Sequence, residues 1–161
     1  MNKRSQIMVY FIGIIIVFID QLSKFLVTKN MDIAEEISII PGFFSLFHIK
    51  NTGAAFSSFT GERIFLIIIS LACIFLIVHL IKKENYQHIL SSISLGMLIG
   101  GIFGNLIDRI FFSGVVDFLS FTIFGYKFPV FNIADICITC GVAIYVVLSI
   151  IKDMKKETAK E

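Results

Sequence analysis

The sequence predicts an all-α membrane protein with four transmembrane helices and a small β-containing loop subdomain outside the membrane. Apolar residues make up 57% of the 161 residues, and only 16% are charged. The mean hydropathy is +0.89. A soluble domain of this length could not bury that much apolar surface. Four apolar segments are each near the ~20 residues that a helix needs to cross a ~30 Å bilayer core. We therefore expect one integral membrane domain over residues 1–161.

The four expected helices differ in their polar content. They are expected at about residues 6–27, 64–81, 89–107 and 130–151. The first contains Asp20 and Lys24, the second has no formal charge, and the fourth contains Asn132 and Asp135. The third is rich in Gly and Ser, which let neighbouring backbones approach closely, so we expect it at the centre of the bundle. The first apolar run lacks a small-residue cleavage site, so we expect it to be a retained helix.

The basic residues predict the orientation of the chain in the membrane. With four spans, both termini and the loop between the second and third helices share one side. Eight basic residues lie on that side: Lys3, Arg4, Lys82, Lys83, Lys152, Lys155, Lys156 and Lys160. Because short loops rich in Lys and Arg stay in the cytoplasm, we expect both termini there. The two longer loops, about 28–63 and 108–129, would then face outward.

The first outer loop has the composition of a small sheet. Residues 37–50 read ISIIPGFFSLFHIK, with many β-branched and aromatic residues around a Pro-Gly turn. This pattern predicts a hairpin or a small sheet. Its phenylalanines suggest that the subdomain rests on the membrane surface.

Polar residues from four segments are expected at a single depth. A helix rises about 1.5 Å per residue, so counting from the expected boundaries places each group along the membrane normal. Six residues fall in the outer third: Asp20, Asn105, Arg109, Asp117, Asn132 and Asp135. Ionisable groups inside spans are costly and usually functional. Packing alone does not readily explain this shared layer.

Each of these residues also has a structural interpretation. Asp20 and Lys24 are spaced i, i+4 and can form an ion pair that seals a helix interface. Arg109 can extend its side chain to lipid head groups. Asp117, taken alone, is an ordinary acid in a loop, and we expect Asp108 to be solvated. Only Asp135, within a span, favours a functional role by itself.

The sequence gives little support for a metal, a cofactor or a nucleic-acid partner. The histidines are scattered, and Cys137 and Cys140 form a lone C-x-x-C with no second pair to complete a zinc site. We interpret these cysteines as packing residues. The serines, among them Ser57, Ser58 and Ser113, have no plausible nearby base. The net charge of +2 is too small to indicate nucleic acid.

Asp117 and Asp135 would form a catalytic pair if the fold brought them together. Two carboxylates a few Å apart do not both ionise easily, so the pair retains one proton. The ionised member can take a proton from water as the water attacks a peptide carbonyl. The protonated member can donate to the carbonyl oxygen and then to the departing amine. Asn105 or Asn132 would orient the carboxylates, and Arg109 would restrain a substrate carbonyl or a neighbouring acid.

Five short motifs resemble those of the lipoprotein signal peptidases (signal peptidase II). They are DQLSK at 20–24, KNTGAAF at 50–56, GGIFGNLIDR at 100–109, VVDF at 115–118 and FNIAD at 131–135. They match the family boxes D-Q-x-[ST]-K, N-x-G-A-[AS]-F, G-G-x-x-G-N-x-x-D-R, V-x-D-[FY] and F-N-x-A-D. The order and the four-helix topology match as well. Each box alone is weak, but the five together are specific.

This resemblance implies an aspartyl endopeptidase of the bacterial cytoplasmic membrane, with its active site near the outer face. It would cleave diacylated prolipoprotein substrates just before the lipidated cysteine, without a cofactor or metal. Asp117 and Asp135 match the family's catalytic aspartates. The positions that line or support the site match Asp20, Lys24, Asn51, Gly53, Asn105, Arg109 and Asn132. The resemblance also implies contact with membrane lipids and inhibition by globomycin-type cyclic peptides. We expect a monomer.

Three other classes of protein fit these residues less well. A transporter or proton relay using Asp20, Lys24 and Asp135 predicts polar residues along a path through the bilayer, whereas here they are concentrated in the outer third. A structural or assembly factor needs no two acids at one depth. A presenilin-type protease carries Gly-x-Gly-Asp on a helix, whereas this chain has Gly114-Val115-Val116-Asp117 before one.

Overall fold

The computed structural model describes residues 3–53, 62–83 and 89–158. Within these ranges the chain forms four long helices: α1 (Lys3–Asn30), α2 (Arg63–Lys83), α3 (Ile89–Phe111) and α4 (Ile133–Thr158). All four are long and apolar enough to cross a membrane. Each extends a few residues beyond the sequence estimate at one or both ends, except that α4 begins three residues later. The predicted fold class is confirmed.

Helix α3 is the centre of the bundle, as its small residues predicted. It packs against α1, α2 and α4, and 13 of its residues are buried. Glycines make this close packing possible. A Cβ at Gly100 would lie 2.8 Å from the carbonyl oxygen of Gly13 on α1, and a Cβ at Gly101 would lie 2.6 Å from that of Ala134 on α4. Larger residues at these positions would push the backbones apart.

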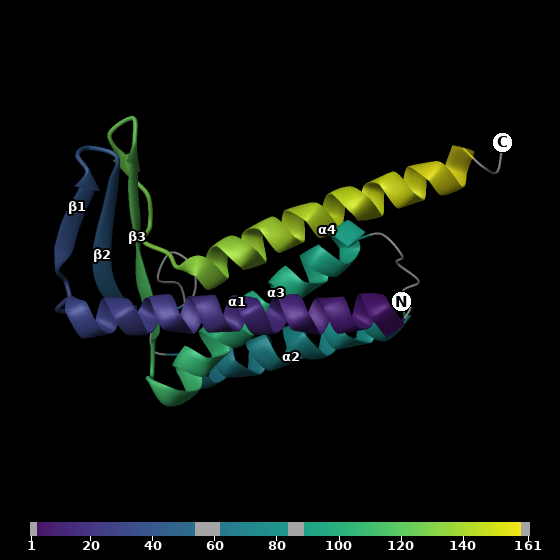
Figure 1. Ribbon diagram of the computed structural model, residues 1–161, viewed down its shortest axis with the longest axis horizontal. Coiled ribbons are helices and arrows are strands. Elements are labelled where there is room, and N and C mark those ends of the chain that lie inside the picture. Colours follow the sequence, from purple (N-terminus) through teal and green to yellow (C-terminus); the bar gives the residue numbers. More distant parts are fainter. Residues whose placement is uncertain (1–2, 54–61, 84–88, 159–161) are drawn as a thin grey trace.

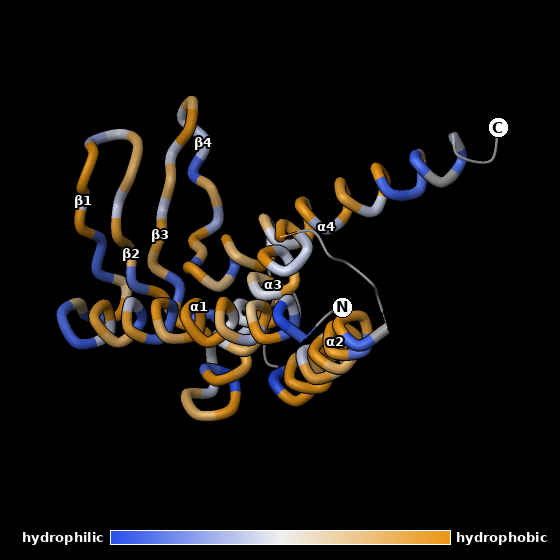
Figure 2. Tube along the Cα trace, turned by 45° about the vertical axis from the view of Figure 1, so that its right-hand side comes forward, coloured by the Kyte–Doolittle hydropathy of each residue, from blue (hydrophilic) through white to orange (hydrophobic). Residues whose placement is uncertain are grey.

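The outer surfaces of the helices are apolar. Large exposed hydrophobic side chains include Phe11 and Phe18 on α1, Ile64 and Phe75 on α2, and Val147 on α4. Helix α2 is hydrophobic along most of its length (Figure 2). In water this surface would be strongly unfavourable, whereas in a bilayer it faces hydrocarbon.

A small antiparallel sheet lies at one end of the bundle, and both termini lie at the other (Figure 1). Its strands are β1 (Glu36–Ile40), β2 (Phe44–Asn51), β3 (Val115–Ile123) and β4 (Tyr126–Lys127), in the order β1-β2-β3-β4. The predicted hairpin in the first loop is therefore present. In the β2–β3 register Asn51 pairs with Val115 and Ile49 with Asp117.

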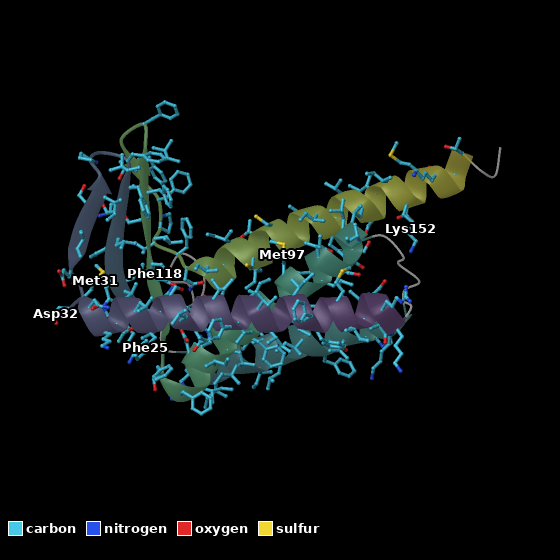
Figure 3. The ribbon with its side chains drawn as sticks, viewed as in Figure 1. Phe25, Met31, Asp32, Met97, Phe118 and Lys152 are labelled. Atoms are coloured by element: carbon cyan, nitrogen blue, oxygen red, sulfur yellow. The ribbon has the colours of Figure 1, made fainter. Side chains whose placement is uncertain are left out.

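The sheet is anchored to the end of α1 by a separate apolar cluster. Its buried members are Val27 of α1, Met31 directly after α1, and Phe118 of β3. Met31 and Phe118 lie at the junction of helix and sheet (Figure 3). Phe121 of β3 stacks on Phe44, with ring centroids 4.7 Å apart, and on Phe131, at 5.7 Å. These contacts fix β3, which carries Asp117, relative to the helices.

The second outer loop contains regular structure that was not predicted from the sequence. Helix α3 continues to Phe111, and β3 and β4 occupy much of the segment assigned to the loop of about residues 108–129. Arg63 at the start of α2 closes the end of α3, where it donates to the carbonyl oxygens of Arg109 and Ile110, both at 2.6 Å. A cation at a helix C-terminus satisfies carbonyl groups that lack an intrahelical partner.

Some residues discussed from the sequence lie outside the described ranges. They are Ala54, Ala55 and Phe56 of the second motif, together with Ser57, Ser58 and Lys160.

Replacing Gly104 with alanine is expected to destabilise the bundle. The new Cβ would lie 2.5 Å from Oδ2 of Asp20, which is completely buried on α1. Overpacking of this kind costs about 1–3 kcal/mol. The thermal unfolding midpoint of purified Gly104→Ala in detergent should fall, whereas the exposed Thr139→Ala on α4 should match the wild type. An unchanged midpoint for Gly104→Ala would show that α1 and α3 are not packed as described.

Candidate active site

The two predicted aspartates meet where the sheet joins the bundle. Asp117 lies on β3 and is only 2% exposed. Asp135 lies in the first turn of α4 and is half-buried. The 18 positions between them allow the chain to turn back through β4 before α4 begins. The backbone of Phe131 bonds to Leu119 of β3, which brings the start of α4 beside Asp117.

Asn132 connects the two carboxylates directly. Its side-chain amide donates to Oδ1 of Asp117 at 2.6 Å. Its backbone N–H donates to Oδ2 of Asp135 at 3.2 Å, and its own Oδ1 accepts from the backbone N–H of Asp135 at 3.0 Å. This reciprocal pair is a capping box at the N-terminus of α4. Asn132 therefore caps the helix and holds both acids.

The other oxygen of each aspartate is bonded by another asparagine. Nδ2 of Asn51, at the end of β2, donates to Oδ2 of Asp117 at 2.9 Å. Nδ2 of Asn105 on α3 donates to Oδ1 of Asp135 at 2.8 Å. Each of the four carboxylate oxygens therefore accepts one N–H bond, and the two aspartates are held at a fixed separation and orientation.

A buried ion cluster formed by residues of α1 and α3 supports this arrangement. Nζ of Lys24 lies 2.8 Å from Oδ2 of Asp20, 3.1 Å from Oδ2 of Asp108 and 3.0 Å from Oδ1 of Asn105. The predicted pairing of Asp20 with Lys24 is thus present. The expectation that Asp108 is solvated is wrong, since Asp108 is 1% exposed. Asp108 is buried because it forms an ion pair with Lys24 and accepts a hydrogen bond from the backbone N–H of Val116 at 3.1 Å.

Asp20 extends the cluster to the start of α4. Its Oδ1 accepts from the backbone N–H of Ala134 at 3.0 Å. The first N–H groups of a helix have no intrahelical partner and carry a partial positive charge, so a carboxylate there is favourable. Asp20 therefore holds the N-terminus of α4 against α1.

Arg109 and Gly53 lie at the edge of the site. The guanidinium of Arg109 is half-buried and approaches the carbonyl oxygens of Gly53 and Asn105 at 3.4 and 3.5 Å. Gly53 is itself held by Oδ1 of Asn51, which accepts its N–H at 2.9 Å. Gly53 adjoins the site through Asn51, which bonds Asp117. Neither Arg109 nor Gly53 is hydrogen-bonded to Asp117 or Asp135 among the contacts of the described residues.

The environment of Asp117 favours its protonated form. Burial raises the pKa of Asp117 to about 7. The amide of Asn51 opposes this rise, and the carboxylate of Asp135 adds to it. Near neutral pH this group can therefore either give or take a proton.

Gln21 and Asp108 support the site as well, although neither is among the site residues predicted from the sequence. Nε2 of Gln21 donates to Oδ1 of Asp108 at 2.9 Å and to the carbonyl oxygen of Gly104 at 3.1 Å. Both residues stand in motifs already noted, and Asp108 is one turn from Asn105 on α3. The spacing of three residues between Asn105 and Asp108 puts both on one face of α3, and this is the feature of the sequence that indicates a site role for Asp108.

The fold and site define a class of protein: a polytopic membrane protein with two carboxylates held together at one end of its bundle. The model of the family signal peptidase (SPase) II matches residues 12–151. A lipoprotein signal peptidase of Symbiobacterium thermophilum is 43% identical over 133 residues, covering 83% of this chain and 88% of that protein. One of Staphylococcus aureus (strain JH9) is 34% identical over 158 residues, covering 94% and 96%.

Solved structures agree with these sequence relatives. Two structures of a bacterial membrane enzyme superpose with TM-scores of 0.84 and 0.80, each at 32% identity. The first covers 92% of this chain and 90% of that one, and the second 90% and 93%. The chain belongs to the signal peptidase II family, the lipoprotein signal peptidases. It is therefore a multi-pass bacterial membrane protein and a peptidase.

Asp117 is expected to titrate near neutral pH. The carbonyl stretch of its protonated carboxyl group should disappear from the infrared spectrum as pH rises through about 7. This band should be absent in Asp117→Asn and retained in Asp32→Asn, a change at an exposed acid. Asn51→Leu removes a bond that lowers the pKa of Asp117, so the midpoint should move to higher pH. A band that titrates below about pH 5, as in an ordinary aspartate, would contradict this environment.

Proposed function

We propose that the protein is an aspartic endopeptidase in which Asp117 and Asp135 activate water. The observation that carries this proposal is the position of Asn132, which bonds one carboxylate through its side chain and the other through its backbone. Packing alone does not require two acids to share a partner. Acid–base hydrolysis requires both acids beside one scissile bond.

The proposed reaction uses the two acids in different protonation states. Asp117, whose pKa is raised to about 7 by burial, carries the shared proton. Asp135 takes a proton from a water molecule, and the water oxygen attacks the peptide carbonyl. Asp117 donates its proton to the carbonyl oxygen. The tetrahedral intermediate then collapses and the C–N bond breaks. One of its hydroxyl groups returns a proton to Asp117, and the departing amine takes the proton held by Asp135.

The proposed substrate is a prolipoprotein with a diacylglyceryl group on the cysteine that follows the signal peptide. Membership of the lipoprotein signal peptidases supports this substrate class. The cut would fall just before the lipidated cysteine. Its acyl chains remain in the outer leaflet, so the scissile bond would lie near the outer boundary of the membrane. A globomycin-type cyclic peptide would occupy the same site.

The proposed orientation places the termini in the cytoplasm and the aspartates near the outer face. Both termini lie at the end of the bundle opposite the sheet (Figure 1). Basic residues are concentrated at that end, which favours the cytoplasmic side. The sheet subdomain exposes large apolar side chains, among them Phe43, Phe124 and Phe128. Contact with outer-leaflet lipid would cover them. We propose that one chain is sufficient for the reaction.

Loss of either carboxylate is expected to abolish cleavage. Asp117→Asn and Asp135→Asn keep the size of the side chain but remove the group that exchanges protons. Cleavage of a purified diacylated prolipoprotein should fall by about 100-fold or more in each.

Asp32→Asn is the matched control, because Asp32 is exposed beyond the end of α1. It should cleave at the wild-type rate, and a chelator should not affect the wild type. Full activity in either Asp117→Asn or Asp135→Asn would refute the pair. Activity abolished by a chelator would indicate a metal-dependent reaction instead.

Lipidation of the substrate is expected to control the rate. Each buried CH₂ of an acyl chain contributes about 0.8 kcal/mol to membrane or apolar binding. The same precursor without its diacylglyceryl group should show kcat/KM lower by about tenfold or more. Equal values for the lipidated and unlipidated precursors would refute lipid-dependent docking while leaving the aspartate pair untouched.

A further inference from the structure

Three asparagines present amide N–H groups to the aspartates, and each can do so in only one orientation. An asparagine amide can flip, which exchanges its donor and its acceptor. Here each amide oxygen is held by a donor other than its aspartate bond. Asn51 accepts from the N–H of Gly53, Asn132 from the N–H of Asp135, and Asn105 from Lys24 and from Nδ2 of Asn132.

Lys24 differs from the other donors because it is a charged side chain buried within the bundle. It is 3% exposed, and its ammonium group has three N–H donors. Among the described residues its partners are Oδ2 of Asp20, Oδ2 of Asp108 and Oδ1 of Asn105, all within 3.1 Å. Two of these partners are anions that balance the charge. The third, Asn105, is neutral and bonds Asp135 with its other end.

We propose that Lys24 is a positioning residue for the peptidase reaction and acts on Asp135 through Asn105. The ammonium group holds Oδ1 of Asn105, so Nδ2 must face Asp135. Without Lys24, the neutral donor Nδ2 of Asn132, at 3.1 Å, is what remains bonded to Oδ1 of Asn105. The amide is then held less strongly, and a flip points its oxygen at the Asp135 carboxylate and removes the N–H bond from Nδ2 of Asn105 to that group. This inference rests on the proposed function of the aspartate pair.

A simpler role for Lys24 would be charge balance alone. Asp20 and Asp108 are both almost fully buried, and unpaired charges there would be costly. The two roles predict different behaviour when the charge is removed together with its counterion. In Asp20→Asn/Lys24→Met the cluster keeps its net charge, because one anion and one cation are lost together, but Asn105 loses its charged donor and keeps the bond from Nδ2 of Asn132. In Asp20→Asn/Lys24→Gln the net charge is the same and an amide N–H is available near Asn105.

The experiment compares these two double variants with Asp20→Asn and with the wild type on a diacylated prolipoprotein. Thermal unfolding in detergent establishes that each is folded. We expect Asp20→Asn/Lys24→Met to lose about tenfold in kcat relative to Asp20→Asn, the equivalent of one hydrogen bond to a charged group. KM should change little, and the pH dependence of kcat should shift, since the environment of Asp135 has changed. Asp20→Asn/Lys24→Gln should recover much of the lost kcat.

Each other outcome overturns the inference. Equal kcat in Asp20→Asn and Asp20→Asn/Lys24→Met would show that neither the charge nor the N–H groups of Lys24 affect the reaction. Equal losses in the Met and Gln double variants, with no shift in pH dependence, would mean that the donor does not matter. A rise in KM at constant kcat would place Lys24 in substrate binding. None of these results would affect the requirement for Asp117 and Asp135, which their asparagine variants test separately.

Discussion

The rest of the site depends on the contacts that the ammonium group of Lys24 makes inside the bundle. It joins α1 to α3 through Asp108 and Asn105, and its partner Asp20 joins α1 to the first turn of α4. A buried ion pair contributes little net stability, but removing one partner costs about 3–5 kcal/mol. The cluster therefore acts mainly as a constraint. It admits one arrangement of three helices, in which the start of α4 faces β3.

The sheet supplies what the helices alone could not. Asp117 lies outside the bundle on β3, and its position depends on the register with β2, which brings Asn51 beside it. The apolar contact of Phe118 with Val27 and Met31 then fixes this strand on α1. One acid is thus held by the sheet and the other by a helix, with Asn132 between them. The site exists only where these two elements meet.

Much of this arrangement could be predicted from the sequence. The four helices followed from hydropathy, the central place of α3 from its glycines, and the first hairpin from residues 37–50. The shared depth of the polar residues followed from counting along the helices. The burial of Asp108 did not, because its neighbour Lys24 is 84 positions away in the sequence. Strand β3 was missed because its pairing with β2 is equally remote in the sequence, although residues 119–123 alternate between apolar and polar side chains.

The spacing of Asp20 and Lys24 bears on how the protein is made. Synthesis proceeds from the N-terminus, so α1 enters the bilayer long before Asn105, Asp108 or Ala134 has left the ribosome. Two separate charges would oppose this insertion. Placed one turn apart on the same helix, 2.8 Å from each other, they can neutralise each other without help. The pair that later organises the finished enzyme also lets its first segment cross the membrane alone.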